Sequence, residues 1–322
     1  MANHLRLLPL LCLALAVTVT ATATATASAD FRAVLNHPYA AAGSSISNDK
    51  MLRRSATASR ARMWRLHARL VTNTSSVPVA ALSDQGYTVT VGIGTPPQPQ
   101  TLILNTASDL CWTQCKLFHG TTRQRGPLYD PARSPSFPAA AVCARTSIPK
   151  LVAPSPTSGI ISLDSRSASV LSQLAMTIFS YCFTPFAKRK TGRGSMPLSA
   201  PLSPPLKPGH LFLGATAMEN LQRHNKSWAI QSTPLLRLST SPSPFCYVQL
   251  VGLSLGTRRL AVPAATLTSN PTIVDSGSTI AYLVHKAFKF LNEAILEEVK
   301  LPVANRTVED YSCASCCRAA WR

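Results

Sequence analysis

The chain has 322 residues, a length sufficient for one large domain or two of moderate size. Its hydrophobic fraction of 46% is that of a globular protein, and its 25 prolines argue against a mainly helical one. Lys and Arg outnumber Asp and Glu by 32 to 13, but this excess is spread along the chain without an aromatic-and-basic array or zinc-finger spacing. We therefore favour a solvated basic surface, and no binding of nucleic acid is expected.

The first 29 residues have the organisation of a secretory signal peptide. A short basic start precedes an apolar run at residues 7–19, and a tail of small residues ends at Ala27-Ser28-Ala29, which is the pattern of a cleavage site. The apolar run is too short to span a bilayer, and no longer apolar run follows, so no membrane span is expected. We expect a secreted, extracellular protein, or one in the vacuolar lumen.

Cysteines and sequons are consistent with an oxidising compartment. Of nine cysteines, Cys12 lies in the signal segment, and the others are Cys111, Cys115, Cys143, Cys182, Cys246, Cys313, Cys316 and Cys317. Their even number favours disulfides, although the sequence does not choose the pairing. The three cysteines near the end lack a second ligand pair, so no metal site is expected. Sequons at Asn73, Asn225 and Asn305 are candidates for glycosylation.

Residues 30–80 differ in composition from the rest of the chain. Arginines recur there, and between residues 31 and 80 the single acidic residue is Asp49. The arginines include Arg53, Arg54, Arg60, Arg62, Arg65 and Arg69. Residues 50–70 contain few helix breakers and predict a basic helix. The segment is interpreted as a flexible linker or as a removable pro-segment whose cations neutralise an acidic cleft. The preceding signal and the following strand pattern favour the pro-segment.

From Tyr87 the hydrophobic period becomes two, which predicts a strand at residues 87–94, and a second strand follows at 101–104. Residues 117–152 predict mostly loop, and residues 169–179 a short helix capped by Ser169. A Pro-rich and Ser-rich linker at 187–208 predicts a boundary between lobes at 81–200 and 201–322. Strands are predicted at 210–213, 232–236, 246–255 and up to 262, before an amphipathic helix at 285–299.

Two apolar strands run into similar polar loops, at Asn105-Thr106-Ala107-Ser108 and at Asp275-Ser276-Gly277-Ser278. Two such loops facing each other are how an enzyme could assemble a pair of carboxylates around one water. In this chain the first loop offers a carboxamide, Asn105, and the second a carboxylate, Asp275. Whether the protein is an enzyme depends on that difference.

The stretch YTVTVGIGTPPQPQTLILNTASDLCWTQC, at residues 87–115, resembles the N-terminal catalytic region of plant pepsin-like aspartic endopeptidases of the nepenthesin type. That family has a strand, GTPPQ, an apolar strand, Asp-Thr-Gly-Ser-Asp and then Trp-Thr-Gln-Cys. Further matching stretches are PLYDPARSPSF, GIISLDSRSASVLSQL, FSYCFTPF, GHLFLGATA, QSTPLL, YVQLVGLSLGTRRLAVP and IVDSGSTIAYL. Together they cover most of residues 87–299 in the family's order.

The resemblance implies an all-β, bilobal pepsin-like fold with a few short helices and an active cleft between the lobes. It also implies hydrolysis of a protein or peptide substrate at acidic pH, without metal, cofactor or covalent intermediate, and we expect a monomer. Two nearby carboxylates share one proton, so that the ionised one takes a proton from water while the other polarises the carbonyl. Asp275 then occupies one catalytic position and Asn105 the other. The supporting residues are Thr106, Ala107, Ser108, Ser276, Gly277 and Ser278.

Several positions depart from the family's pattern. Asn105 has nearly the shape of aspartate but does not ionise. Ala107 and Ser162 replace glycines, and a methyl group at 107 would strain a loop that needs glycine's backbone freedom. Residues 144–158 contain no tyrosine and are too few for the family's flap hairpin, and residues 300–322 are too few for the remaining strands of the second lobe. We expect the flap and the end of the second lobe to be missing.

Three hypotheses follow. The chain is an aspartic endopeptidase by descent, with low or no activity because of Asn105. Alternatively, it is a non-catalytic secreted binding protein, or an inhibitor of proteases or glycosidases, on the same scaffold. The third hypothesis is a truncated or mis-spliced gene product that does not fold well, since missing strands would leave unpaired edges.

Overall fold

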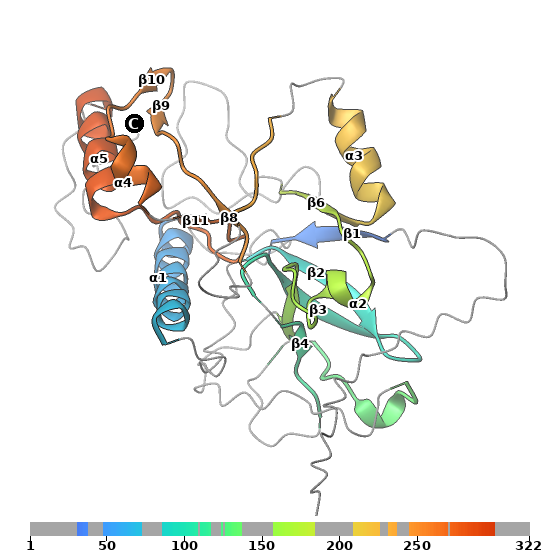
Figure 1. Ribbon diagram of the computed structural model, residues 1–322. Helices are drawn as coiled ribbons and strands as arrows, with labels where there is room; N and C mark the ends of the chain where they lie inside the picture. Colours follow the sequence, from blue (N-terminus) through green and yellow to red (C-terminus); the bar gives the residue numbers. More distant parts are fainter. Residues whose placement is uncertain are drawn as a thin grey trace, which may run out of the picture.

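The computed structural model describes residues 31–37, 48–72, 86–108, 110–116, 124, 126–136, 157–183, 209–225, 231–236, 245–269 and 271–299. The largest feature of these residues is a seven-stranded sheet with the order β4-β5-β3-β2-β1-β7-β6 (Figure 1). Its strands are β1 (Phe31–Asn36), β2 (Thr88–Ile93), β3 (Gln98–Asn105), β4 (Trp112–Thr113), β5 (Gly159–Ser162), β6 (Phe179–Cys182) and β7 (Gly209–Leu213). Neighbouring strands are antiparallel except β3 and β5, which are parallel.

The hairpin of β2 and β3 confirms the strands predicted from the period of two. β3 begins at Gln98 rather than at Thr101, because Gln98 pairs with Ile93 directly across the turn. Gly94 in that turn has a φ of 83°, a backbone conformation that side chains with a Cβ rarely adopt. The hairpin carries the chain to Asn105, the last residue of β3.

Strand β1 was not predicted. It lies inside the sheet, where Leu35 pairs with Val89 of β2 on one side and with Gly209 of β7 on the other. Leu35 is 1% exposed. Apolar side chains occupy every second position of its six residues, but this pattern is too short to predict a strand at the start of a basic segment. The beginning of this segment is therefore an interior strand of the sheet.

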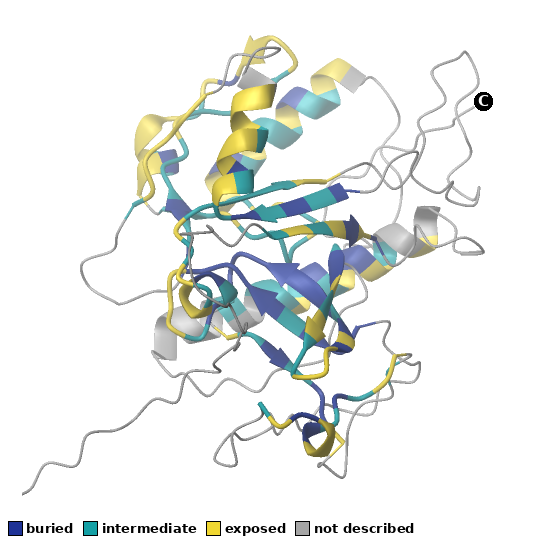
Figure 2. Ribbon diagram, turned by 90° about the vertical axis from the view of Figure 1, so that its right-hand side faces the viewer, coloured by how far each residue is buried: buried dark blue, intermediate teal, exposed yellow. Residues whose placement is uncertain are grey.

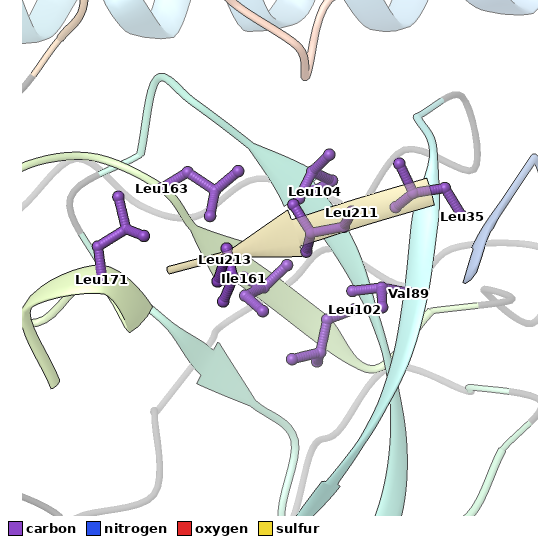
Figure 3. Packing of buried hydrophobic residues seen from close by; sticks show 9 residues of the cluster. All are labelled: Leu35, Val89, Leu102, Leu104, Ile161, Leu163, Leu171, Leu211 and Leu213. Atoms are coloured by element: carbon purple, nitrogen blue, oxygen red, sulfur yellow. The ribbon is translucent and has the colours of Figure 1, made fainter. Parts of the chain in front are cut away.

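One apolar cluster lies between the sheet and the elements packed on it (Figure 3). Its members are Leu35, Val89, Leu102, Leu104, Ile161, Leu163, Leu171, Leu211 and Leu213. Each fully buried side chain of this kind contributes about 1.5–3 kcal/mol of transfer free energy. Burial is concentrated in these strands, whereas the helices outside the sheet present exposed faces (Figure 2). The core fixes β3 and β5, whose last residues reach the candidate site.

Two short sheets and two helices form a second part beside the seven-stranded sheet (Figure 1). Its elements are β8 (Tyr247–Val248), β9 (Ser254–Leu255), β10 (Arg258–Arg259), α4 (Ala264–Thr268), β11 (Thr272–Ile273) and α5 (His285–Val299). The helix predicted at 285–299 is confirmed, but the strands predicted at 246–255 and up to 262 are only two residues long each. The strand predicted at 232–236 is reduced to a bridge from Leu236 to Tyr247. The mainly β, two-part architecture agrees with the predicted pepsin-like bilobal fold.

The remaining helices are α1 (Asn48–Thr72), α2 (Val170–Gln173) and α3 (Ala215–Asn225), with a 3-10 turn at Pro131–Arg133. The long α1 confirms the basic helix, and α3 was not predicted. Ser169 caps α2 as expected, since its side chain accepts a hydrogen bond from Ser172 N at 3.2 Å. The prediction that α2 reaches residue 179 is wrong, because Ala175 leaves the helix with a φ of 52°.

Several predictions fall outside the described residues. These are the signal segment, Asn73 and Asn305, the chain end at 300–322, and most of the short stretch before Gly159. Asn225 is the last residue of α3. Among the residues that the structure describes, no helix has the length and apolar character needed to cross a membrane.

Candidate functional site

Strand β3 delivers Asn105 to the site, where the residue is 1% exposed. Its Oδ1 accepts hydrogen bonds from Ala107 N at 2.9 Å and from Arg62 Nη2 at 2.8 Å. Because both partners are donors, they fix the side-chain amide with its oxygen toward them. The structure therefore holds Asn105 as an acceptor.

Asp275 reaches the same place from the loop after β11. Its Oδ1 accepts from Gly277 N at 2.9 Å, and its Oδ2 accepts from Ser278 Oγ at 2.6 Å. Asn105 and Asp275 thus make the same bond to the backbone N–H two residues ahead, so the two loops repeat one local geometry. Ser108 differs from Ser278, because its Oγ donates to Leu110 O at 3.4 Å.

A reciprocal set of hydrogen bonds joins the two loops. Thr106 Oγ1 donates to Val274 O at 2.8 Å and accepts from Ser276 N at 3.0 Å. Ser276 Oγ donates to Leu104 O and accepts from Thr106 N, both at 3.1 Å. Each of these bonds contributes about 1 kcal/mol net. This cross-brace connects residues 170 positions apart in the chain and keeps the two polar side chains together.

Arg62 of α1 lies between these two side chains. Its Nε donates to Asp275 Oδ2 at 2.6 Å, and its Nη2 donates to Asp275 Oδ1 at 2.7 Å. The same Nη2 donates to Asn105 Oδ1 at 2.8 Å and to Ala107 O at 3.1 Å. The ion pair is largely withdrawn from solvent, with the side chains of Arg62 and Asp275 14% and 9% exposed. A two-pronged arginine–carboxylate pair of this kind is among the stronger polar contacts in proteins.

The face of α1 that carries Arg62 is fitted to the site over several turns. Thr279 N donates to Ser59 Oγ at 3.1 Å, and Ser59 is 2% exposed. Leu66 packs against the apolar cluster formed by Ala107, Phe245 and Tyr247. Ser59, Arg62 and Leu66 are spaced so that they lie along one side of a helix. The sequence predicted a basic helix with cations for an acidic site, but it did not distinguish Arg62 from its neighbours or assign Ser59.

Gly277 makes room for the guanidinium group. A Cβ atom at this position would lie 2.9 Å from Arg62 Cζ and 3.0 Å from Arg62 Nε. Ala107, at the corresponding place of the first loop, is not strained as anticipated. Its backbone lies outside the positive-φ region, and its methyl group is 2% exposed against Phe245 and Tyr247.

Ser162 lies beside the Asn105 loop, opposite Asn105 in the register of β3 and β5. Its hydroxyl donates to Ser108 O, and its N–H donates to Cys111 Sγ at 3.1 Å. The serine in place of a glycine is therefore tied to the first loop by hydrogen bonds. Asp164, which is 1% exposed, follows closely and accepts from Arg166 N at 3.0 Å.

Thiol and phenol groups near the site have raised pKa values, mainly because they are buried. Burial, together with the nearby charge of Asp164, raises the pKa of Cys111 to about 11. Burial also raises the pKa of Tyr181, and the neighbouring Cys246 and Asp275 raise it further. Cys111, Cys182 and Cys246 are free thiols, whereas Cys115 is disulfide-bonded. The even number of cysteines therefore did not predict the state of these three.

The arrangement offers one carboxylate, one carboxamide and one guanidinium. Because a carboxamide does not ionise, Asn105 does not share a proton with Asp275. Among the described residues, no group of three or more His, Cys, Asp or Glu side chains is placed to hold a metal ion.

Similarity to known proteins agrees with this geometry. The sequence model of a family described as "Xylanase inhibitor N-terminal" matches residues 87–148. Aspartic proteinase nepenthesin-1 of Nepenthes gracilis is 25% identical over 332 residues, which span 85% of this chain and 70% of that protein. Over most of its length the chain is thus similar to plant pepsin-like aspartic proteases.

Further plant aspartic proteases are similar to the chain over different lengths. Aspartic proteinase nepenthesin-2 of Nepenthes gracilis is 22% identical over 84% of this chain and 69% of its own length. Aspartyl protease 37 of Oryza sativa subsp. japonica is 27% identical over 56% of this chain and 46% of its own length.

Proposed function

We propose that this chain is an aspartic-type endopeptidase homologue in which peptide-bond hydrolysis is impaired or lost. The observation that carries the proposal is the pairing of a single carboxylate, Asp275, with Asn105 at the position of the first catalytic aspartate. The supporting residues are Thr106, Ala107, Ser108, Ser276, Gly277 and Ser278, which orient and connect the two loops.

The chemical reason lies in the division of labour between two carboxyl groups. In a working pair, the ionised carboxylate takes a proton from water, and the protonated one polarises the substrate carbonyl and supplies a proton. Asp275 can serve in the first role. Asn105 has no acidic proton, and its Oδ1 is turned toward Ala107 N and Arg62. The loss of one acid or base group costs a factor of about 10²–10⁴ in rate.

Arg62 further restricts the site in the intact chain. Its guanidinium occupies the position between Asn105 and Asp275 and neutralises the carboxylate. This supports a pro-segment at residues 30–80 that shields the site, between a signal peptide at 1–29 and lobes at 81–200 and 201–322. We further propose secretion to the extracellular space or the vacuolar lumen, glycosylation at the sequons, and a monomer that meets a protein or peptide.

A second candidate is a non-catalytic secreted binding protein, or an inhibitor of proteases or glycosidases, on the same scaffold. It is favoured by the match of residues 87–148 to a family described as "Xylanase inhibitor N-terminal". It is also favoured by a site whose one negative charge is already balanced. This candidate requires a folded, monodisperse protein with a protein ligand.

Restoring the carboxylate separates the two candidates. Asn105→Asp, with and without Arg62→Ala, is tested against a panel of acid-cleavable peptides, and Asp275→Asn in the same background is the matched control. A gain of about 10²-fold or more that Asp275→Asn abolishes supports an endopeptidase ancestry disabled at residue 105. A well-folded Asn105→Asp protein without any gain shows that Asn105 is not what limits activity and favours the binding protein.

A further inference from the structure

Four oxygens accept hydrogen bonds from Nε and Nη2 of the Arg62 guanidinium group. Asp275 Oδ2 and Oδ1 lie 2.6 and 2.7 Å from Nε and Nη2 of Arg62. Asn105 Oδ1 and Ala107 O lie 2.8 and 3.1 Å from the same Nη2. Because Nη2 has two hydrogens for three acceptors, the longest of these contacts shares a hydrogen with another. All four contacts are made by acceptors, and together they carry the single negative charge of Asp275.

The acceptors are oriented by groups other than Arg62. Ala107 N holds Asn105 Oδ1 at 2.9 Å, and Gly277 N and Ser278 Oγ hold the two oxygens of Asp275 at 2.9 and 2.6 Å. These bonds are internal to the two loops, and none of them involves Arg62. A ligand that replaces Arg62 therefore meets a site that is already arranged, which lowers the entropic cost of binding.

The shape of the site favours a flat cation. Gly277 leaves space where a Cβ atom would come within 2.9–3.1 Å of Cζ, Nε and Nη2 of Arg62, so the guanidinium plane lies close over the backbone of this residue. A lysine ammonium group is compact, so it does not contact both carboxylate oxygens of Asp275 and Asn105 Oδ1 at the same time. Both the geometry and the charge thus match a guanidinium group better than an ammonium group.

Asn105 makes this role compatible with the loss of catalysis. A carboxamide oxygen remains a neutral acceptor, so the site keeps one negative charge for one positive ligand. With aspartate at 105, two carboxyl groups would share a proton, and one of them would present a donor to the guanidinium group. Asparagine at position 105 therefore removes the shared proton, and both Asn105 Oδ1 and the Asp275 carboxylate remain hydrogen-bond acceptors.

We propose that this site is a guanidinium receptor, which binds an arginine side chain of a peptide or protein partner when Arg62 does not occupy it. The inference rests on the proposed loss of the catalytic pair, since it assigns a binding role to Asn105 and Asp275. Arg62 is then an internal occupant that competes with the arginine of the partner. Ser59 and Leu66 keep α1, and with it Arg62, at the site.

The test uses the full chain with Arg62→Ala, which removes the internal guanidinium, and N-methylguanidinium as the probe. Binding is measured by calorimetry and by the rise of the melting temperature at probe concentrations below those that denature proteins. Methylammonium and urea are controls for charge alone and for planar shape alone. N-acetyl-arginine amide and N-acetyl-lysine amide then compare the two side chains. Wild-type protein and Arg62→Ala/Asp275→Asn are titrated in parallel.

We expect saturable binding of N-methylguanidinium to Arg62→Ala with a dissociation constant of about 1–10 mM, as for a ligand of this size. The controls, the wild-type protein and the double variant should each bind at least tenfold more weakly. Equal binding by the double variant, or no saturable binding to a folded Arg62→Ala protein, overturns the proposal. If Arg62→Ala folds poorly, its refolding yield is measured instead: an increase with N-methylguanidinium and not with methylammonium supports the receptor, and no increase overturns it.

Neither readout depends on proteolysis, so the receptor and the proposed function fail separately. Guanidinium binding by Arg62→Ala without any gain of activity in Asn105→Asp supports the receptor and removes the argument that residue 105 disables an enzyme. A gain of activity in Asn105→Asp without guanidinium binding removes the receptor alone.

Discussion

Replacing Arg62 with alanine should destabilise the protein more than the loss of any exposed ion pair. The substitution leaves Asp275, whose side chain is 9% exposed, without the cation that contacts both of its oxygens. Removing one partner of a buried pair costs about 3–5 kcal/mol. Because Asp275 keeps its bonds from Gly277 N and Ser278 Oγ, we expect the lower end, about 3 kcal/mol.

A double-mutant cycle isolates this contact. Asp275→Asn removes the charge that Arg62→Ala leaves uncompensated, so the double variant should be more stable than the sum of the two single effects by about 1–3 kcal/mol. Arg62→Lys keeps the positive charge but loses the paired Nε and Nη2 donors, and should lower the unfolding free energy by about 1–2 kcal/mol. Unfolding free energies are taken from urea midpoints at an unchanged slope.

The exposed ion pair between Arg258 and Glu297 supplies a matched control. Its N–O distance is 2.8 Å, close to the 2.6 Å of the Arg62 pair, but its side chains are 56% and 61% exposed. Arg258→Ala should therefore cost less than about 1 kcal/mol. If Arg62→Ala costs no more than Arg258→Ala, the interpretation of Arg62 as a buried, site-filling cation is wrong.

Three further predictions address the surroundings of the site. Gly277→Ala should lower stability by about 1–2 kcal/mol in urea unfolding, because its methyl group displaces Arg62, and the cost should shrink in an Arg62→Ala background. Thr106→Val should cost about 2 kcal/mol by losing both hydroxyl bonds of the cross-brace, whereas Thr106→Ser, which keeps the hydroxyl, should cost less than half as much; equal costs would refute the brace. With its pKa raised from 9.0 to about 11, Cys111 should react with iodoacetamide at pH 8 about 100-fold more slowly than an ordinary thiol, while the exposed Cys182 reacts readily. Because folding disfavours the Cys111 thiolate, the neutral thiol contributes to the stability of the fold; this contribution is complete below pH 9 and is lost as the pH rises toward 11. Mass spectrometry measures the labelling of Cys111, and unfolding at pH 8 and 10.5 measures the change in stability.

Local patterns predicted the parts of the fold whose residues make regular contacts close in sequence. The alternation from Tyr87 gave the hairpin of β2 and β3, and the apolar face at 285–299 gave α5. The strands of the second part were predicted at 246–255 and up to 262, but they are much shorter than predicted. Pairings such as Ile273 with Tyr247 depend on residues far apart, and two paired residues leave no period to detect.

The candidate site was predictable in its positions but not in its occupant. The two motifs indicated that Asn105 and Asp275 would meet, and the basic segment indicated cations for that site. The sequence did not show which arginine reaches Asp275, because this depends on the docking of α1 through Ser59 and Leu66. It also suggested that Ala107 would be strained, although the methyl group is simply buried.

The central claim is that Asn105, rather than the scaffold around it, prevents hydrolysis. It is tested most directly by comparing the kcat/KM of Arg62→Ala with that of Arg62→Ala/Asn105→Asp on one acid-cleavable peptide, with Arg62→Ala/Asn105→Asp/Asp275→Asn as the blank. We predict a rise of about 10²-fold or more in the double variant and none in the blank. Equal values for the folded Arg62→Ala protein and the folded double variant would contradict the account.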